Sequence, residues 1–201
     1  PILLDMKNNS EALFRLNTAE LLGEIGSGKF YNDEGEVIKS VPANKADVEK
    51  TYSALIEMLN DFDATVRIAA AKALGEVIKS DVEYCGDKVF SALVEKTKDT
   101  DPRVRCAAVQ SLGEIEREKS CDVLIEMRGD KEKSVQNAIA KILEERSVGR
   151  TYSEKAFNAL KEMSCNPHCL VRPAIAKLLL KTGTLGAYNV LMEMKKDKSV
   201  D

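Results

Sequence analysis

The sequence has little of what many folds and functions need. Its 201 residues include no tryptophan, a single histidine and only 5% aromatic residues. A bulky globular core draws on aromatic side chains, so we expect helices packed through leucine, isoleucine, valine and alanine instead. No apolar run is long enough to span a bilayer, and no charged segment followed by an apolar one opens the chain as a secretory signal. We therefore expect no association with a membrane.

The charge balance also lacks a strong bias. There are 30 basic and 33 acidic residues, a net charge of −3 at pH 7, whereas nucleic-acid-binding domains usually carry a pronounced basic patch. The five cysteines are an odd number scattered among helical segments, which indicates free thiols in a reducing compartment. We predict a cytoplasmic protein that is not expected to bind nucleic acid.

A short motif recurs along the chain in a fixed register. Leu-x-acid-Met occurs five times, as at Leu3–Met6 and Leu55–Met58, and Leu93–Lys96 is a sixth copy with lysine in the Met position. Asn or Asp stands three positions later in every copy, which suits a tight turn because the side chain bonds nearby backbone amides. The apolar positions eight, eleven, twelve, fifteen and sixteen beyond the Met follow the spacing of a buried helical face. Each copy is thus interpreted as a helix end, a polar turn and a second helix.

Two segments, Asp63–Gly75 and Asp101–Gly113, both read Asp-x-x-Val-Arg-x-x-Ala-x-x-x-Leu-Gly. This pattern resembles HEAT repeats, and most closely the short subtype called phycobilisome-lyase HEAT-like repeats. The resemblance implies an all-α fold, a right-handed α-solenoid of about five antiparallel helix pairs plus a sixth first-helix. Later copies depart from the pattern, since Gln136 replaces the Arg, and Glu144 and Leu180 replace the Gly.

We predict a single repeat array over residues 1–201. Repeats are expected at about 1–26, 47–79, 87–117, 119–146 and 153–182, with a partial repeat at 186–201. Residues 27–46 form an inserted loop, which we interpret as solvated, although insertions of this kind can also contact partners. Because both ends fall within a repeat and terminal repeats need polar capping faces, we expect the chain to be a fragment of a longer array.

Two local motifs could carry chemistry, and both are weak. Gly23–Phe30 has the spacing of a phosphate-binding loop, but phenylalanine stands where that loop needs serine or threonine. We interpret Gly23 as a glycine that ends a helix, like Gly75 and Gly113. Cys165–Cys169 offers two cysteines and the single histidine, which is fewer ligands than zinc usually takes. We therefore expect no catalytic residue, no bound cofactor and no metal.

An arginine column stands nine positions beyond the Met and comprises Arg15, Arg67, Arg105 and Arg172. We interpret it as a structural ladder in which each guanidinium bonds turn carboxylates, such as those of Asp63 and Asp101, or backbone carbonyls of a neighbouring repeat. The alternative is an anion-binding stripe. That alternative is weaker because the adjacent acids would compensate the positive charge.

The face of each second helix opposite its apolar stripe is the candidate binding surface. In HEAT solenoids the second helices line the concave surface, so the resemblance implies that these side chains line a groove. The candidates are Ile68, Lys72, Glu76, Gln110, Glu114, Asn137, Lys141, Glu145, Lys177 and Lys181. Their charges predict a groove that is acidic at one end and more basic at the other.

We predict a protein-protein interaction scaffold whose partner is another protein or another domain of the same polypeptide. The alternative is a regulatory or lyase-like subunit of an enzyme that handles a bound prosthetic group, with Cys106 or Cys121 as the thiol of an adduct. A third hypothesis, weak nucleic-acid binding through Lys141, Lys177 and Lys181, is disfavoured by the charge balance. HEAT-repeat hydroxylases hold iron with repeated His-Glu pairs, which one histidine does not supply.

Overall fold

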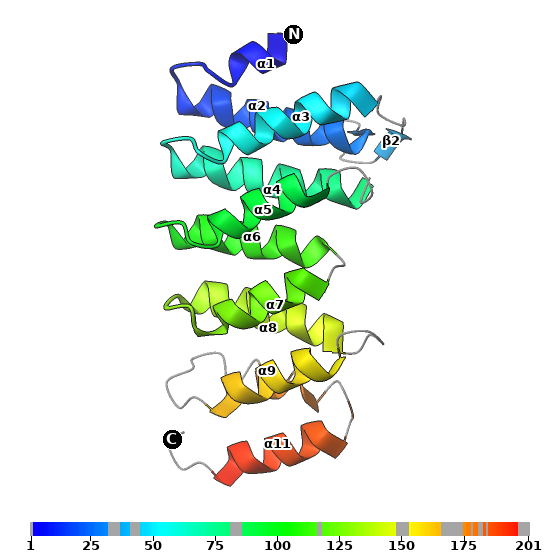
Figure 1. The fold of residues 1–201 in the computed structure, drawn as a ribbon, viewed down its shortest axis with the longest axis vertical. Helices are drawn as coiled ribbons and strands as arrows, with labels where there is room; N and C mark the ends of the chain where they lie inside the picture. Colours follow the sequence, from blue (N-terminus) through cyan, green and yellow to red (C-terminus); the bar gives the residue numbers. More distant parts are fainter. Residues whose placement is uncertain are drawn as a thin grey trace. The chain divides into compact units, whose positions relative to one another are not determined.

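The computed structural model of the chain describes residues 2–31, 37–40, 45–80, 86–115, 118–147, 153–165, 175–177, 179–180, 183 and 185–196. The chain divides into two compact units, residues 1–115 and residues 116–201, and each is described here by itself. Helices make up most of the described residues in both units (Figure 1). The predicted all-α fold class is confirmed.

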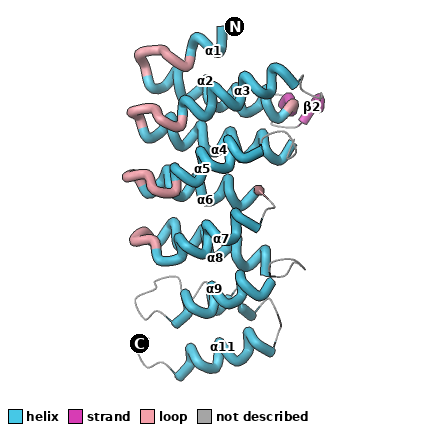
Figure 2. The backbone as a smooth tube through the Cα atoms, in the orientation of Figure 1, coloured by secondary structure: helices cyan, strands magenta, loops and turns pink. Residues whose placement is uncertain are grey.

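In the described part of the first unit, helices follow one another in three pairs. The first helices are α1 (Ile2–Met6), α3 (Lys45–Met58) and α5 (Gly86–Lys96), and the second helices are α2 (Ala12–Ser27), α4 (Ala64–Ser80) and α6 (Pro102–Glu114). The second helices form a layer in which α2 packs against α4 and α4 packs against α6. The turns that join the helices of each pair lie along one edge of this unit (Figure 2). Successive turns are therefore neighbours in space.

The insertion predicted as a loop at 27–46 contains regular structure. Strands β1 (Lys29–Tyr31) and β2 (Val37–Ser40) form an antiparallel hairpin. Helix α2 ends at Gly28, which has a left-handed φ of 66° and donates its N–H to the carbonyl of Ile25. Glycine adopts this conformation without steric cost, so the chain turns directly from the helix into β1.

The second unit continues the alternation of short helices. Its elements are α7 (Glu118–Glu126), η1 (Met127–Gly129), α8 (Lys133–Ser147), α9 (Ser153–Cys165) and α11 (Leu185–Lys196). Helix α8 packs against α9, and α9 packs against α11. The helix expected at 168–182 falls mostly outside the described residues. Within the ranges that the structure describes, no helix is long and apolar enough to cross a membrane.

Two leucine columns of the repeat supply most of the largest fully buried side chains. One column precedes the turn on the first helix, and the other lies near the end of the second helix. Their fully buried members are Leu55, Leu74, Leu93, Leu112, Leu124, Leu143, Leu160 and Leu179. Burying one such side chain contributes about 1.5–3 kcal/mol relative to leaving it in water. The buried face that the spacing predicts for the second helices is confirmed at Leu74, Leu112, Leu143 and Leu179.

Two glycines that the sequence analysis interpreted as helix ends lie inside helices. A Cβ built on Gly23 of α2 would be 2.8 Å from the Cβ of Ala73 in α4, and one on Gly75 would be 2.7 Å from Oγ of Ser111 in α6. Both contacts are too short for a side chain, so these glycines permit neighbouring second helices to approach closely. The same Ser111 hydroxyl donates to the carbonyl of Ala71 at 2.7 Å. The helix-ending interpretation of Gly23 and Gly75 is therefore wrong, and the glycine that ends α2 is Gly28.

Candidate functional site: the exposed face of the second helices

The Asn or Asp column fixes the turn at the start of each second helix. In four successive turns this side chain accepts a hydrogen bond from the backbone N–H two residues later, at 2.8 or 2.9 Å. The acceptors are Asn9, Asp61, Asp99 and Asp130, and the donors are the amides of Glu11, Asp63, Asp101 and Glu132. A side chain that bonds the backbone in this way replaces a backbone turn, as the sequence predicted for this column.

Arg15 joins the turn of its own repeat to the turn of the next. Its Nε and Nη2 lie 2.6 and 2.9 Å from the two carboxylate oxygens of Asp61, a bidentate pair. Its Nη1 donates to the carbonyl oxygens of Asn9 and Ser10 at 2.8 and 3.0 Å. The guanidinium also lies over the ring of Phe62, with Cζ 4.3 Å from the ring centroid.

Arg67 repeats this arrangement one repeat further along. Its Nε and Nη2 each lie 2.9 Å from a carboxylate oxygen of Asp99. Its Nη1 donates to the carbonyl oxygens of Asp61 and Phe62 at 2.9 and 3.1 Å. Because Asp61 and Asp99 also hold their own turns, each of these carboxylates couples a turn to the preceding second helix.

The carboxylates named by the sequence analysis, those of Asp63 and Asp101, bond other groups. Asp63 accepts from the N–H and hydroxyl of Thr65 at 2.8 and 2.6 Å. Asp101 accepts from the N–H of Arg103 at 2.8 Å and pairs with its guanidinium at 2.7 Å, which lowers the pKa of Asp101 to about 2. Both carboxylates therefore stabilise the first turns of α4 and α6. The carboxylates that pair with Arg15 and Arg67 are those of Asp61 and Asp99, each two residues before the predicted Asp63 and Asp101.

The protonation of the buried pairs follows from their contacts. Burial by itself raises the pKa of Asp61, but the bonds from Arg15 and from the Asp63 amide, with the charge of Arg15, bring it below its ordinary value. The balance at Asp99 is the same, with Arg67 as the cation, and its pKa is also lowered. The hydrogen bond to Asp61 in turn raises the pKa of Arg15. These arginines are occupied by structural contacts, which disfavours the anion-binding alternative.

The remaining members of the column behave as follows. Arg105 donates Nη1 to the carbonyl oxygens of Asp99 and Thr100 in its own turn, at 3.0 and 3.4 Å. Gln136, which replaces arginine in the next repeat, donates Nε2 to the carbonyl of Asp130. Arg172 lies outside the described residues.

The candidate binding residues lie at the surface of the unit to which each belongs. Ile68 is half-buried, and Lys181 lies outside the described residues. The others are exposed: Lys72, Glu76, Gln110, Glu114, Asn137, Lys141, Glu145 and Lys177. Whether these side chains contact a partner remains a prediction.

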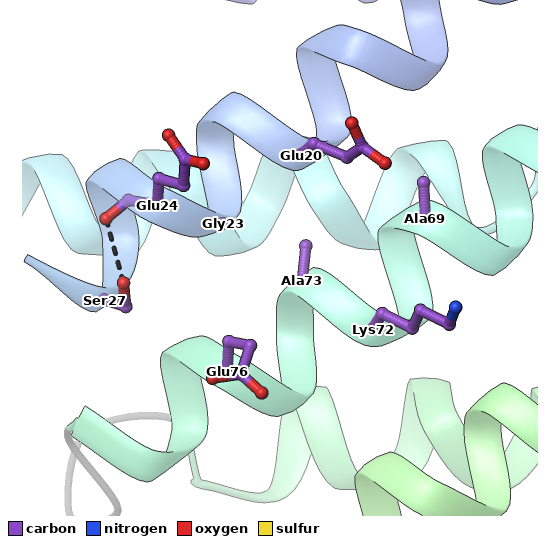
Figure 3. Close-up of a pocket in the computed structure, with 8 residues that line it drawn as sticks. All are labelled: Glu20, Gly23, Glu24, Ser27, Ala69, Lys72, Ala73 and Glu76. Carbon is purple, nitrogen blue, oxygen red and sulfur yellow. Dashed lines mark hydrogen bonds between the residues drawn. The ribbon is translucent and has the colours of Figure 1, made fainter. Parts of the chain in front are cut away.

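A pocket of about 270 Å³ opens on this face between α2 and α4 (Figure 3). Helix α2 contributes Glu20, Gly23, Glu24 and Ser27, and helix α4 contributes Ala69, Lys72, Ala73 and Glu76. The close approach at Gly23 and the methyl groups of the two alanines leave a hollow floor, while longer charged side chains line its rim. Sequence analysis named Lys72 and Glu76 but missed the pocket. The available signal was the alignment of small residues on two adjacent second helices.

The thiols and possible metal ligands show no reactive arrangement in the part of the chain that the structure describes. No group of three or more His, Cys, Asp or Glu residues there could hold a metal ion. Cys121 is buried and Cys106 is half-buried. Burial raises the pKa of the Cys106 thiol, against the opposing charge of Lys72, so the reactive thiolate is disfavoured. Most of the Cys165–Cys169 motif lies outside the described residues.

Comparisons with known proteins agree with this architecture. A chain from the structure of the Pds5–Scc1 complex is similar over 98% of this chain and 33% of its own length, with 16% identity and a TM-score of 0.69. An engineered protein covers 97% of this chain and 84% of its own length, with 18% identity and a TM-score of 0.57. A designed armadillo repeat protein covers 98% and 92%, with 15% identity and a TM-score of 0.56. No curated protein sequence matches the chain significantly.

The fold and its internal repeat define an α-helical repeat protein whose solenoid architecture is similar to that of these structures. Residues 52–144 match the sequence pattern described as HEAT repeats. This segment is therefore similar to HEAT repeats, as the resemblance implied. The narrower phycobilisome-lyase subtype remains a prediction.

Proposed function

We propose that the chain is a protein-binding scaffold that presents the exposed face of its second helices to a peptide segment of a partner. The pocket between α2 and α4 is the observation that carries this proposal. It lies on a face whose charged side chains are not used by the core, and small residues hollow it out. Designed armadillo proteins made for modular peptide recognition share this fold, with a TM-score of 0.55 and 15% identity over 98% of this chain and 92% of theirs.

Rigidity of the underlying backbone supports a binding role. The floor of the pocket is held by the Gly23–Ala73 approach, and the adjacent α4–α6 contact is held by the Ser111 hydrogen bond. The Arg15 and Arg67 ion pairs fix the turns that precede these helices. A surface that is ordered before binding loses little conformational entropy when a partner docks.

The proposal assigns no catalytic role to the chain and keeps the predicted cytoplasmic location, which rests on the odd number of cysteines, five, scattered among helical segments. The regulatory or lyase-like alternative gains no support from the buried Cys121 or from Cys106, whose thiol is kept protonated. The partner is another protein or another domain of the same polypeptide.

Selection from an unbiased peptide display library tests the scaffold role. The purified chain should enrich peptides that no longer bind a variant with Glu20→Ala, Lys72→Ala and Glu76→Ala. A matched variant with Glu49→Ala, Lys88→Ala and Glu95→Ala removes the same charges from exposed positions on first helices. It should bind the enriched peptides like the parent chain. Circular dichroism confirms that both variants fold. Failure to enrich any peptide, or equal losses in both variants, would contradict the proposed surface.

A further inference from the structure

We propose that the pocket between α2 and α4 accepts a lysine or arginine side chain, and that the partner segment is basic. This inference deepens the proposed scaffold function and rests on it. The size of the pocket is the first argument. Sites for whole small molecules usually enclose about 300–1,000 Å³, and this one encloses about 270 Å³. One long side chain suits this space better than a free metabolite does.

The lining suits the two halves of such a side chain. Gly23, Ala69 and Ala73 give an apolar floor on which a methylene stem can lie. Glu20 and Glu24 stand along the rim on α2 (Figure 3). Both glutamates are exposed, and neither forms an ion pair with a residue that the structure describes. A cation bound between them would gain charge-assisted hydrogen bonds that the free chain leaves unused.

The charge around the pocket favours the same ligand. Glu76 adds a third carboxylate to the lining, against the single ammonium group of Lys72. The first unit holds 20 acidic and 14 basic residues, a net charge of −6, whereas the second unit holds 13 and 16, a net charge of +3. The field of the first unit therefore attracts cationic segments and repels acidic ones.

The acidic rim extends beyond the pocket along the layer of second helices. The position eighteen beyond the Met is glutamate on all three, as Glu24 on α2, Glu76 on α4 and Glu114 on α6, and each is exposed. Packed helices stand about 8–10 Å apart, and a peptide in the polyproline II conformation advances about 9 Å per turn of three residues, with every third side chain on the same face. A chain that crosses the layer thus meets a new glutamate about every third residue. The expected motif is a basic residue at every third position.

Fluorescence anisotropy with defined peptides tests this inference. The probe is a labelled ten-residue peptide with arginine at positions 1, 4, 7 and 10 and neutral residues between, designed for the helix spacing above. A control peptide carries four consecutive arginines. The spaced peptide should bind more tightly than the clustered one, at equal charge. Equal affinity would show that only net charge is recognised and would overturn the register.

Charge-matched variants separate the pocket from general electrostatics. The double substitution Glu20→Gln with Glu24→Gln should lower the affinity for the spaced peptide by about tenfold, because charge-assisted hydrogen bonds are lost. Glu49→Gln with Glu95→Gln, on first helices, removes the same charge and should change affinity by about twofold or less. An equal loss of affinity in the two double variants would overturn the proposed site.

The two levels of the proposal fail differently. Should the unbiased library yield peptides that depend on the second-helix face but contain no lysine or arginine, the scaffold stands and the basic-segment inference falls. Should it yield no peptide at all, the scaffold proposal itself falls.

Discussion

The two units use the same repeat position differently. In the first unit, Arg15 and Arg67 each bond the carbonyls of their own turn and the carboxylate of the following turn. In the second unit, Gln136 bonds the carbonyl of its own turn. A neutral amide offers donors on one nitrogen and does not match a carboxylate in a bidentate ion pair. Arginine at this position therefore performs two tasks with one side chain, holding its own turn and joining two repeats.

The core does not show this difference. Leu74 in the first unit and Leu143 in the second stand at the same repeat position, and both are fully buried. Leucine packing is thus common to both units, while the two bidentate ion pairs described above, Arg15 with Asp61 and Arg67 with Asp99, lie in the first. The comparison suggests that packing supplies most of the stability and that arginine mainly fixes the register between repeats.

The largest predicted effect tests the shared core. Leu74→Ala and Leu143→Ala should each destabilise the protein by about 2–5 kcal/mol, because each leaves a cavity in a packed interior. Urea unfolding followed by circular dichroism measures the change. Leu180→Ala is the matched control, since Leu180 is 67% exposed. Unchanged unfolding of the Leu74 variant would contradict the repeat register.

The next prediction concerns a substitution that gives the first unit the glutamine that the second unit carries at this repeat position. Arg67→Gln should cost about 1–3 kcal/mol, because Asp99 would keep its burial and lose its cationic partner. Hydrogen exchange should quicken in the turn that holds Asp99. Arg103→Gln serves as the control, since its side chain is 66% exposed, and the loss of its exposed ion pair should destabilise the protein much less than Arg67→Gln does. Equal effects of the two substitutions would show that the buried pair carries no special weight.

Acid should act on the same pairs. The pKa values of Asp61 and Asp99 are lowered in the folded chain, so the unfolded state binds more protons at low pH. The stabilisation is therefore complete above the ordinary aspartate pKa of about 3.9 and is lost as the pH falls through the lower folded values. Urea midpoints should drop below about pH 4. The urea midpoint should depend less steeply on pH in the Arg67→Gln variant. An unchanged pH dependence would exclude Asp99 from the acid response.

Local rules made much of the fold predictable. The Asn or Asp column acts on an amide two residues away, so its role at Asp61 and Asp99 follows from neighbouring sequence. The leucine columns follow from helical spacing in the same way. Helix pairs, turns and the buried stripe were thus within reach of the sequence.

Contacts between repeats were not predictable from local rules. The partner of Arg15 is 46 residues away, and choosing Asp61 over Asp63 requires knowing which carboxylate faces the preceding helix. The burial of a side chain also depends on which helices pack beside it, and a single repeat does not determine this. Leu21 and Ala73 share a repeat position, yet Leu21 is 43% exposed and Ala73 is 6% exposed, because Gly23 of α2 lies against Ala73. The pocket was missed for this reason, since its shape depends on two helices together.

The smallest predicted effect concerns a pattern that the comparison brings out in the sequence. In the sequence, the Asn or Asp position of the repeat that follows each arginine of the column is aspartate, as at Asp61 and Asp99, whereas in the repeat that follows Gln136 it is Asn166. A repeat with a charged residue at the arginine position is thus followed by a repeat with a charged aspartate, and the repeat with neutral Gln136 is followed by one with neutral Asn166. Either substitution alone, Gln136→Arg or Asn166→Asp, introduces a charge without its counterpart and should be neutral or slightly destabilising.

The double variant should recover this loss, with a coupling energy of about 1 kcal/mol in a double-mutant cycle, because the repeat register predicts that the two new side chains pair as Arg67 and Asp99 do. Urea unfolding of the four proteins in low and high salt measures the coupling, which should shrink as salt screens the charges. Strictly additive effects would mean that the matched types at these two positions are coincidental. The arginine link would then depend on an aspartate that the backbone of its own turn holds against the guanidinium, as at Asp61 and Asp99.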